Sequence, residues 1–582
     1  MGLNHTYPEG VHLIDFEFRP VNGREGNPPE PICLVVREYP SGNTRRYWRD
    51  ELLAMQSAPF PVNQRAMSVA YFASAEMDCF LSLGWALPDN LLDLFTEFRC
   101  RTNGIGAPFG NGLVGALQYF GLPALDVDAK DDMRNLALRG GPWTDQEEAD
   151  LLDYCESDVV ALHHLLDAME PKIDWPRALL RGRYMKAVSH MQMVGVPIDI
   201  AVLDRLMPNW EDLKAALIAQ VDADFGVFDG GTFKAALWAQ YLARENIEWP
   251  MRSDGSLLLD DDTFKAMAKV HPKINPIREL RASLSAMRLS GLAVGDDGRN
   301  RCLLSPFQSV TGRNQPSNTK FIFGPAVWMR GLIKPKPGYG LAYIDYSQQE
   351  FGIAAALSCD LAMQKAYESG DPYLAFAKQA GAVPPHATKE SHKAEREQFK
   401  ACVLAVQYGM GEDALAIRIG QPVARARKLL RLHRQTYAAF WKWSDACLDE
   451  AVLNRRLWAS YGWTHHVAES FNPRSLRNFP MQANGAEMLR LACILLTEAG
   501  INVCAPVHDA LLIEAPLVQL DDRVSLAKDL MGYASEQVLD GFRLSSDVKR
   551  VLDSERYMDD RGVEMWHRIE SMLASSSLTG GV

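Results

Sequence analysis

The sequence predicts a protein of two parts, an α/β domain over residues 1–175 and an α+β part with helical appendages over residues 176–582. The polar stretch "MEPKIDWPRA" at 169–178 separates two long helical patterns and contains prolines, which is typical of a linker. Before it, a strand-like segment rich in β-branched and aromatic residues precedes a long helical pattern. After it, helical segments are followed by short apolar strands that alternate with long amphipathic helices, and this mixture favours an α+β fold.

The composition is that of an ordinary globular protein. Of the 582 residues, 47% are hydrophobic and 23% are charged, and no run of roughly 18 apolar residues could form a membrane span. The N-terminus "MGLNHTYPEG" lacks the pattern of a signal peptide, so we expect a cytoplasmic protein. The ten cysteines form no CxxC pair, which argues against a zinc site. The net charge of −12 argues against a nucleic-acid partner unless basic residues gather on one face.

The first part carries carboxylates whose spacing indicates a metal site. "VHLIDFEFRP" at 11–20 is predicted to be a strand, and its period of two puts Asp15 and Glu17 on one face. On a predicted helix, Tyr154 and Asp158 are four residues apart and therefore neighbours. Oxygen ligands suit Mg²⁺ or Mn²⁺, and a pair of such ions can activate water at a phosphodiester. Hydrolysis of nucleic acid is the functional interpretation, and the alternative is that these acids only solvate a strand and a helix.

The order of these residues resembles that of the DEDDy 3′→5′ proofreading exonucleases, which have an RNase H-like fold. The resemblance implies that Asp15, Glu17 and Asp158 hold two metal ions. It also implies that Tyr154 orients the attacking water.

A middle acid of this family is expected between the strand and the helix. There the sequence offers Glu76 and Asp78, and the spacing to "LGW" and "LLDLF" favours Glu76 as the catalytic acid. The family usually has Asp, preceded by an Asn that is missing here, so the choice between the two acids stays open.

The second part contains an apolar run with a charged centre, "CAPVHDALLIEAP" at 504–516. Its apolar halves predict the strands of a hairpin with His508 and Asp509 at the tip. A buried Asp is costly unless a partner or a metal neutralises it. "GLAYIDYSQQEFGIAAALS" predicts a strand that ends at Asp345 and a helix that starts near Ser347. If the hairpin lies beside this strand, the two aspartates meet and can hold two Mg²⁺ ions about 4 Å apart for phosphoryl transfer.

Between these stretches, "EREQFKACVLAVQYGMG" predicts a helix with a graded face. Residues spaced by four form one stripe on it: Arg396, Lys400, Leu404 and Tyr408. The cations at one end would contact phosphates, and the apolar and aromatic residues at the other end would contact a sugar and a base. The alternative for this helix taken alone is a solvated basic face.

In chain order, these stretches resemble motifs A, B and C of the family A DNA polymerases. Motif A corresponds to residues 345–350, motif B to residues 396–409, and motif C to His508 and Asp509. Further matches are "TGR" at 311–313 and "RSLRNFPMQANGAEM" at 474–488. The resemblance implies a right-hand polymerase domain over residues 176–582, with a palm built on an antiparallel sheet and with helical fingers and thumb.

The same resemblance implies the subdivision of this domain. The thumb is expected at 195–310, the palm at 311–365 and 466–582, and the fingers at 366–465. We expect no 5′ nuclease domain before the exonuclease, which is the layout of phage enzymes.

The resemblance also implies a role for each matching residue. The metal ligands would be Asp345, Tyr346 and Asp509. The dNTP would be bound by Gln348, Glu350, Tyr373, Arg396, Lys400, Leu404 and Tyr408. Primer and template would be bound by Arg313, Arg474, Asn478, Gln482 and His508. Lys400 would protonate the pyrophosphate, and Glu350 would close off the space that a 2′-OH needs.

The sequence departs from the polymerase family at two positions. Ala510 follows Asp509 where the family usually continues with Glu, so a supporting carboxylate is missing while both Asp ligands remain. Leu404 stands where relatives usually have Phe or Tyr against the incoming sugar, which is expected to alter discrimination against dideoxynucleotides.

The leading hypothesis is a monomeric DNA-directed DNA polymerase with 3′→5′ proofreading that replicates a phage genome in the host cytoplasm. Its partners would be primer-template DNA and dNTPs, with two Mg²⁺ or Mn²⁺ ions per active site. The sequence does not reveal a helicase or a single-strand binding protein as a partner. One alternative is a DNA-binding 3′→5′ exonuclease with a degenerate polymerase half, which Ala510 alone supports. Another is a single-subunit RNA polymerase, against which Glu350 and the exonuclease motifs argue.

Overall fold

The computed structural model describes residues 6–123, 127–252, 254–286, 291–324, 327–407 and 409–579 of the chain. The chain divides into two compact units. The first consists of Met1–Gly195, Leu304–Gln315 and Leu341–Arg550, and the second of Val196–Leu303, Pro316–Gly340 and Val551–Val582. Each unit is therefore assembled from segments that are distant in the sequence.

The first unit opens with a mixed sheet of strand order β3-β2-β1-β4-β5. Its strands are β1 (Val11–Pro20), β2 (Pro29–Tyr39), β3 (Thr44–Trp48), β4 (Met67–Ala70) and β5 (Leu91–Asp93). The helices that follow them are α2 (Arg49–Ala54), α3 (Ser74–Ser82), α4 (Leu94–Thr102), α5 (Leu113–Tyr119), α6 (Val127–Arg139), α7 (Asp145–Met169) and α8 (Trp175–Val194). β1 runs antiparallel to β2 and parallel to β4, so the strand predicted over residues 11–20 is confirmed and lies inside the sheet.

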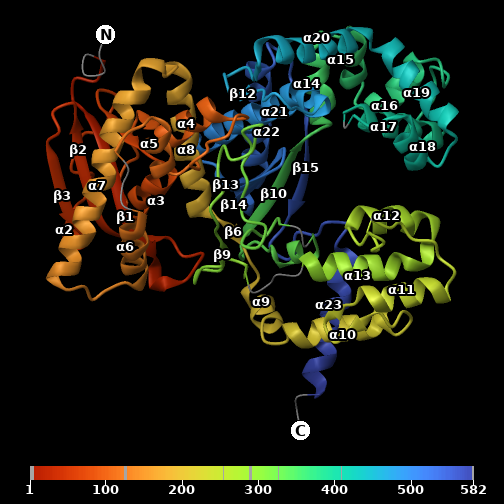
Figure 1. Ribbon diagram of the computed structural model, residues 1–582, viewed down its shortest axis with the longest axis horizontal. Helices are drawn as coiled ribbons and strands as arrows, with labels where there is room; N and C mark the ends of the chain where they lie inside the picture. Colours follow the sequence, from red (N-terminus) through yellow and green to blue (C-terminus); the bar gives the residue numbers. More distant parts are fainter. Residues whose placement is uncertain are drawn as a thin grey trace. The chain divides into compact units, whose positions relative to one another are not determined.

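Alternate residues of β1 face different helices. Val11 and Leu13 belong to an apolar core shared with α7, which lies along the sheet in Figure 1. Phe16 points to the opposite face and packs edge-on against a phenyl ring of α3. Because side chains alternate along a strand, Asp15 and Glu17 continue the row of Val11 and Leu13 on the α7 side.

A second sheet in the first unit has the strand order β13-β14-β10-β15. Its strands are β10 (Tyr339–Tyr346), β13 (Asn502–Val507), β14 (Ala510–Pro516) and β15 (Ser546–Val551). β13 and β14 are antiparallel with Val507 opposite Ala510, so the predicted hairpin with His508 and Asp509 at its tip is confirmed. β14 lies beside β10, which is the neighbour relation that brings Asp509 toward Asp345.

The rest of the first unit is mainly helical. Its helices are α14 (Gln349–Leu357), α15 (Leu361–Glu368), α16 (Pro372–Gln379), α17 (Lys393–Gln407), α18 (Glu412–Ile419), α19 (Val423–Thr436), α20 (Ala438–Asn454), α21 (Pro473–Glu498) and α22 (Leu520–Val538). A short hairpin of β11 (Arg456–Trp458) and β12 (Thr464–His466) interrupts them. The long helix α21 packs against α14, α20 and α22, so it links the helical region to the second sheet.

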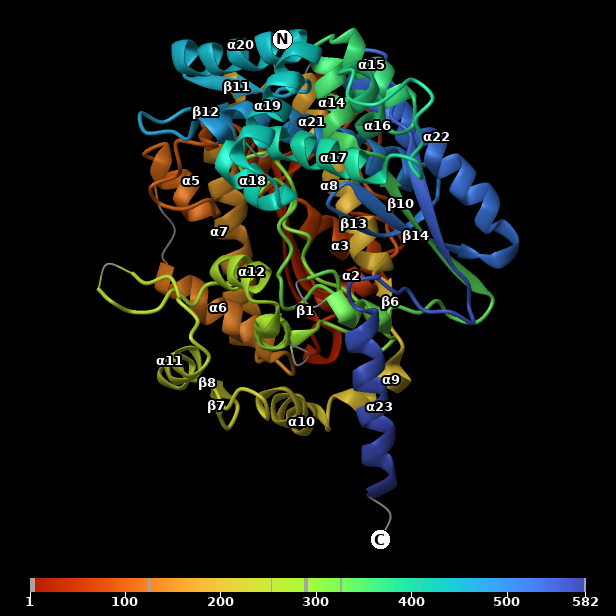
Figure 2. The same ribbon diagram turned by 90° about the vertical axis from the view of Figure 1, so that its right-hand side faces the viewer.

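The second unit is helical apart from short strand pairs. Its helices are α9 (Ile200–Leu206), α10 (Trp210–Asp222), α11 (Ala235–Arg244), α12 (Asp261–Val270), α13 (Asn275–Ala286) and α23 (Val563–Thr579), the last drawn in blue in Figure 2. Trp238 is fully buried and stacks on Tyr241 with 5.2 Å between ring centroids. An ion pair of 2.5 Å between Arg330 and Asp559 joins two of the three chain segments of this unit.

Helix α8 begins within the expected linker and is well packed in the first unit. It contacts α3 and β5 on one side and α21 and β13 on another. A Cβ at Gly182 would lie 1.8 Å from the carbonyl oxygen of Leu91, so only glycine allows this approach. The boundary at residue 175 stays a prediction. Within the described ranges, no helix has both the length and the apolarity that a membrane crossing requires.

Candidate functional site

Residues predicted for the exonuclease motifs gather beside β1, and we call them the N-terminal acidic site: Asp15, Glu17, Glu76, Tyr154 and Asp158. Carboxylate oxygens of Asp15, Glu17 and Asp158 all lie within 4.8 Å of one another. The first two come from β1, and Asp158 comes from the buried side of α7. The strand and helix spacings therefore bring three acids to one place.

Tyr154 lies in the electric field of the same acids. Burial raises the pKa of its phenol, and the negative charges of Asp158, Glu17 and Asp15 raise it further. The hydroxyl therefore keeps its proton at neutral pH and can act as a hydrogen-bond donor. Next to it on α7, the thiol of Cys155 lies 3.3 Å from the Oδ2 atom of Asp15, so this carboxylate also has a neighbour outside the motif.

Glu76 reaches the same acids from α3. Its Oε2 atom accepts a hydrogen bond of 2.8 Å from the backbone N–H of Phe16, the residue between the two acids of β1. Burial raises the pKa of Glu76 well above its usual value, and the charges of Asp15 and Asp158 add to this rise. The side chain is 4% exposed, so its carboxyl lies inside the cluster rather than on the surface.

Asp78, two residues further along α3, has different neighbours. Its carboxylate accepts hydrogen bonds from the Ser189 hydroxyl at 2.6 Å and from the Gln192 amide at 2.8 Å, both on α8. Burial raises its pKa to about 7 against the effect of these two bonds. Asp78 thus attaches α3 to α8, whereas Glu76 lies with the acids of β1 and α7.

The donor set of the N-terminal acidic site fits a hard divalent cation. All of its carboxylate donors are oxygens, which Mg²⁺ and Mn²⁺ prefer. Carboxylates this close repel one another, which adds to the effect of burial on the pKa of Glu76, and a cation would neutralise that repulsion.

The second cluster is formed by Asp345 and Asp509, which we call the C-terminal acidic pair. The backbone N–H of Tyr346 donates to the carbonyl oxygen of Asp509 at 3.3 Å, so the hairpin tip lies against the end of β10. Burial, the charge of Asp509 and a hydrogen bond between the two carboxyl groups raise the pKa of Asp345 to about 7. Burial also raises the pKa of Asp509. Two half-buried carboxyls offer only oxygen donors, so this pair also fits divalent cations.

Asp547 of β15 is a further acid beside this pair, and the sequence patterns did not predict it. Its carboxylate accepts a hydrogen bond of 2.8 Å from the Ser347 hydroxyl, and its charge contributes to the raised pKa of Asp345. Ala510, where relatives usually have Glu, is fully buried at the start of β14. No local signal marks Asp547, because it follows Ser347 by 200 residues.

Arg313 and Glu350 lie in the electrostatic neighbourhood of the C-terminal acidic pair. Burial raises the pKa of Glu350, and the positive charge of Arg313 opposes that rise. The same charge counters the effect of burial on the pKa of Asp509. Glu350 is in the first turn of α14, directly after β10, whereas Arg313 belongs to an irregular segment.

On α17, the basic end of the predicted stripe meets Tyr373 of α16. The guanidinium carbon of Arg396 is 5.5 Å from the ring centroid, and the ammonium nitrogen of Lys400 is 5.9 Å from it. Arg396 also donates to Asp371, the N-cap residue of α16, at 2.5 Å. The two helices therefore fix Arg396, Lys400 and Tyr373 as one group.

The residues predicted to bind DNA on α21 share one face. Arg474, Asn478 and Gln482 follow one another at a spacing of four; Arg474 is exposed and the other two are half-buried. A Cβ at Gly409 would lie 2.9 Å from the Cγ atom of Arg474. Because of this close approach, the start of α21 lies near the end of α17.

The remaining predicted residues have less distinctive surroundings. Gln348 and His508 adopt positive φ angles of 44° and 58°, which fit the sharp turns after β10 and at the hairpin tip. Leu404 is half-buried on α17. Tyr408 lies outside the described residues.

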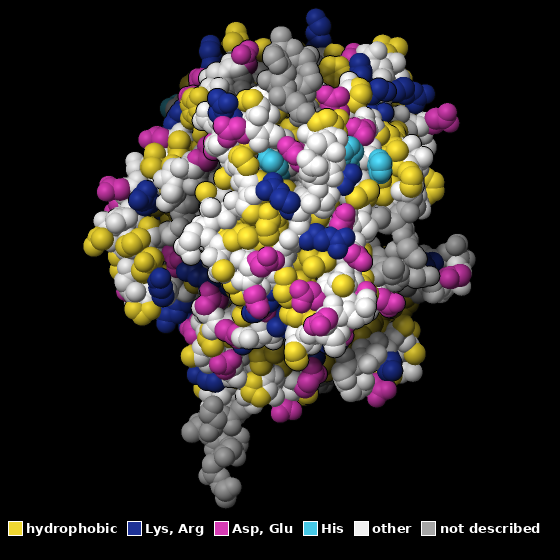
Figure 3. All heavy atoms as spheres, turned by 90° about the vertical axis from the view of Figure 1, so that its left-hand side faces the viewer, with side chains coloured by type: hydrophobic (Ala, Val, Ile, Leu, Met, Phe, Trp, Pro, Cys, Tyr) yellow, Lys and Arg dark blue, Asp and Glu magenta, His cyan; other side chains and the backbone are white. Residues whose placement is uncertain are grey.

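Charged side chains of both signs are interspersed on the face shown in Figure 3. Several basic residues pair with acidic neighbours, as Arg46 does with Asp153 at 2.6 Å and Arg65 with Glu9 at 2.7 Å. Basic side chains on this face are thus accompanied by acidic ones, and the chain as a whole has a net charge of −12.

Comparison with known proteins identifies the polymerase-like part. Residues 308–549 match the family model described as DNA polymerase family A. The chain is 23% identical over 394 residues to "DNA polymerase I, thermostable" of Thermus thermophilus, a match that covers 63% of this chain and 46% of that protein. It is 28% identical over 227 residues to the DNA polymerase of Mycobacterium phage D29, covering 38% of this chain and 37% of that protein.

A solved structure is similar over nearly the whole chain. It is titled "POL domain of Pol1 from M. smegmatis complex with DNA primer-template and dNTP". The TM-score is 0.73 at 18% sequence identity, with 94% of this chain and 96% of that chain covered. The chain therefore has the fold of that polymerase domain.

Residues 308–549, which carry the polymerase-like motifs, thus match the model of DNA polymerase family A, and the chain has the fold of a polymerase domain. The chain spans about half the length of the polymerase I relatives that it matches. The predicted resemblance to family A DNA polymerases is thus confirmed for residues 308–549.

Proposed function

We propose that the protein catalyses template-directed DNA synthesis, joining dNTPs to the 3′-OH of a primer. The observation that carries this proposal is the meeting of Asp345 and Asp509 within the region that matches family A. The family A relatives named above are DNA polymerases, and the similar structure is titled as a complex with primer-template and dNTP, which supports the same substrates here.

In this proposal, Asp345, Asp509 and the backbone of Tyr346 would hold two Mg²⁺ or Mn²⁺ ions. When bound, such ions favour attack by the primer hydroxyl and neutralise the charge that develops on the phosphates. The chain's own part is to keep the two carboxyls together at the end of β10. Asp547 supports this arrangement through Ser347, in a position to offset the missing carboxylate at Ala510.

The dNTP would lie along α17. Arg396 and Lys400 offer cations to its phosphates, with Tyr373 beside them, and Lys400 is suited to give a proton to the leaving pyrophosphate. Leu404 and Tyr408 would contact the sugar and the base. Near the acidic pair, Glu350 and Gln348 would line the sugar side, and Glu350 would exclude a 2′-OH.

Primer and template would be held by residues from three segments. They are Arg313 beside the acidic pair, Arg474, Asn478 and Gln482 on α21, and His508 at the hairpin tip. Minor-groove contacts from such residues would check base-pair geometry without reading sequence, because acceptors there are nearly the same for all pairs.

A second activity, 3′→5′ exonucleolytic proofreading, is supported by the N-terminal acidic site. Asp15, Glu17 and Asp158 have oxygens close enough to share metal ions, and Glu76 lies beside them. Tyr154, which keeps its proton, is suited to orient the attacking water. We propose Glu76, rather than Asp78, as the middle acid because Asp78 is bonded to α8.

The proposed organisation follows from these activities. An RNase H-like exonuclease domain would occupy residues 1–175, and a right-hand polymerase domain residues 176–582, with thumb, palm and fingers as predicted. The match to a phage DNA polymerase supports a role in phage genome replication in the cytoplasm of the host.

The test is one denaturing gel of a 5′-labelled primer-template incubated with the protein and Mg²⁺. With dNTPs the primer should lengthen, and without them it should shorten; EDTA should stop both reactions. Shortening without any lengthening would overturn the synthesis proposal and favour a nuclease whose polymerase half only holds DNA.

A further inference from the structure

Residues Leu304–Gln315, which we call the Arg313 segment, lack helix and strand although part of the segment is deeply buried. Phe307 is fully buried, and positive φ angles occur at Ser305 (48°), Phe307 (59°) and Gly312 (74°). Buried backbone groups need hydrogen-bond partners, and an irregular segment cannot supply all of them from itself. Its conformation must therefore be imposed by other parts of the first unit.

Two residues at the end of α4, in the N-terminal part, supply such partners. The guanidinium of Arg99 donates to the carbonyl oxygens of Phe307 at 3.4 Å and of Gln308 at 3.0 Å. The amide of Asn103 donates to the carbonyl oxygen of Val310 at 2.7 Å and, at 2.8 Å, to that of a residue in β12. Arg99 is 7% exposed and Asn103 is 1% exposed, so these bonds lie in the interior.

Helix α8 holds both ends of the segment. The amide oxygen of Gln192 accepts a hydrogen bond of 2.9 Å from the backbone N–H of Leu304. The hydroxyl of Tyr184 donates to the side-chain oxygen of Asn314 at 3.0 Å. The segment is thus attached at its beginning, middle and end to residues that precede it by more than a hundred positions.

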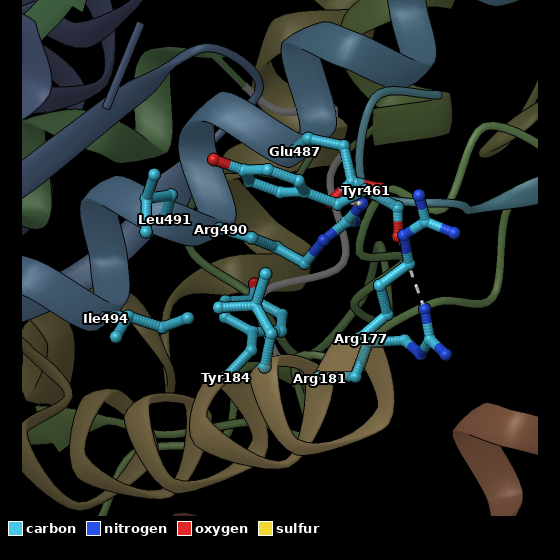
Figure 4. A pocket seen from close by; sticks show the side chains of 9 residues that line it. Arg177, Arg181, Tyr184, Tyr461, Glu487, Arg490, Leu491 and Ile494 are labelled. Atoms are coloured by element: carbon cyan, nitrogen blue, oxygen red, sulfur yellow. Dashed lines mark hydrogen bonds and ion pairs between the residues drawn. The ribbon is translucent and has the colours of Figure 1, made fainter. Parts of the chain in front are cut away.

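Helix α21 contacts the segment as well. Arg490 donates to the carbonyl oxygen of Gly312 at 2.6 Å and lies 4.7 Å from the ring centroid of Phe307. Figure 4 shows Arg490 on α21 and Tyr184 on α8 lining one small pocket, with Arg490 also paired to Glu487. The Gly312 backbone also passes close to Trp463, directly before β12: a Cβ at Gly312 would lie 3.0 Å from the indole nitrogen.

These contacts together determine where Arg313 lies. Its backbone N–H bonds to the Ser309 hydroxyl at 2.7 Å, so the loop is closed on itself directly before Asn314. Its charge acts on Glu350 and Asp509. A shift of the loop would move this cation relative to the acidic pair.

We propose that Arg99 and Asn103 are positioning residues for the polymerase site, acting through the Arg313 segment. The N-terminal part would then have a role in binding primer-template that is independent of hydrolysis at the N-terminal acidic site. This inference rests on the proposed synthesis function. The competing explanation is that Arg99 and Asn103 only hold the first unit together.

The test uses the full chain with Asp15→Ala, so that the primer is not digested. Binding of a fluorescent primer-template is measured by anisotropy, and extension is measured as kcat and KM for the primer-template. Asn103→Ala should weaken binding and raise KM about tenfold, the loss expected for one hydrogen bond from a displaced Arg313 to DNA, with a smaller change in kcat. Arg101→Ala, on the same helix but over the ring of Phe120, should change neither.

A double variant separates positioning from general stability. If Asn103 acts through Arg313, then adding Asn103→Ala to Arg313→Ala should weaken binding no further. Full additivity, or unchanged affinity in Asn103→Ala alone, would overturn the inference. If Asn103→Ala does not show the melting transition of the wild type, Arg99→Lys replaces it, and the same results are expected of that variant. Absence of extension by the Asp15→Ala parent would count against the synthesis function, while anisotropy would still decide the positioning role.

Discussion

The N-terminal acidic site and the C-terminal acidic pair differ in how their carboxylates are brought together. Asp15 and Glu17 are two residues apart on β1, and Tyr154 and Asp158 are one turn apart on α7, so local periodicity determines much of the first site. Asp345 and Asp509 meet only because β14 lies beside β10 in the second sheet. The first site is thus mainly a property of two elements, and the second depends on the assembly of a whole sheet.

The N-terminal acidic site and the C-terminal acidic pair also differ in the charges around them. At the N-terminal acidic site, burial raises the pKa of Glu76, and the negative charges of Asp15 and Asp158 raise it further. At the C-terminal acidic pair, the cation of Arg313 opposes the effect of burial on the pKa of Asp509. The difference teaches that the second site is sensitive to residues far from it in the sequence, including those that hold Arg313.

The comparison predicts that α17 serves only the C-terminal site. Lys400→Ala should slow extension by about a hundredfold or more, because a positioned general acid and a phosphate contact are both lost. Digestion of the same primer without dNTPs should not change. Lys393→Ala, an exposed lysine of the same helix, is the matched control and should leave both rates as they are. Equal loss of both activities in Lys400→Ala would contradict the separation of the sites.

The two acids of α3 sharpen the description of the N-terminal site. Glu76→Gln should reduce digestion about 10- to 100-fold, as expected for a group that orients or supplements metal ligands. Asp78→Asn should leave digestion unchanged, because its partners are on α8. Single-turnover digestion of a labelled strand measures both variants. The reverse pattern would make Asp78 the middle acid.

Asp78 is expected to affect the pH dependence of folding stability rather than digestion. Its pKa is raised to about 7 in the folded protein, against about 3.9 in an unfolded chain. The folded state therefore keeps a proton that the unfolded state releases, and this stability is lost as the pH rises from about 4 through 7. Asn carries no titrating proton, so Asp78→Asn escapes this loss. The free energy of unfolding of the variant, compared with that of wild type, should therefore be about 1–3 kcal/mol higher at pH 8 than at pH 5. Urea unfolding at the two pH values measures this difference. A difference between variant and wild type that is the same at both pH values would refute the raised pKa of Asp78.

The parts of the molecule that follow local patterns could be predicted from the sequence. They include β1 with its acids, α7 with Tyr154 and Asp158, and the hairpin that ends in Asp509. Each depends on a period of two or about four residues, or on a short turn between apolar runs.

The parts that depend on distant contacts could not be predicted. Asp547 approaches the acidic pair through strand order, and the orientations of Glu76 and Asp78 depend on where α8 packs. The Arg313 segment has no regular period, and its shape is determined by donors such as Arg99 and Asn103. These arrangements arise from tertiary packing, which no short stretch of sequence encodes.

The most direct test of the account compares Asp345→Asn with Asp15→Ala on one labelled primer-template, with and without dNTPs. Asp413→Asn, an exposed acid on α18, is the control. Asp345→Asn should lower extension by about a thousandfold, the several kcal/mol that a metal site contributes, and leave digestion intact. Asp15→Ala should do the reverse. Loss of both activities in either variant would contradict the assignment of two separate acidic sites to two reactions.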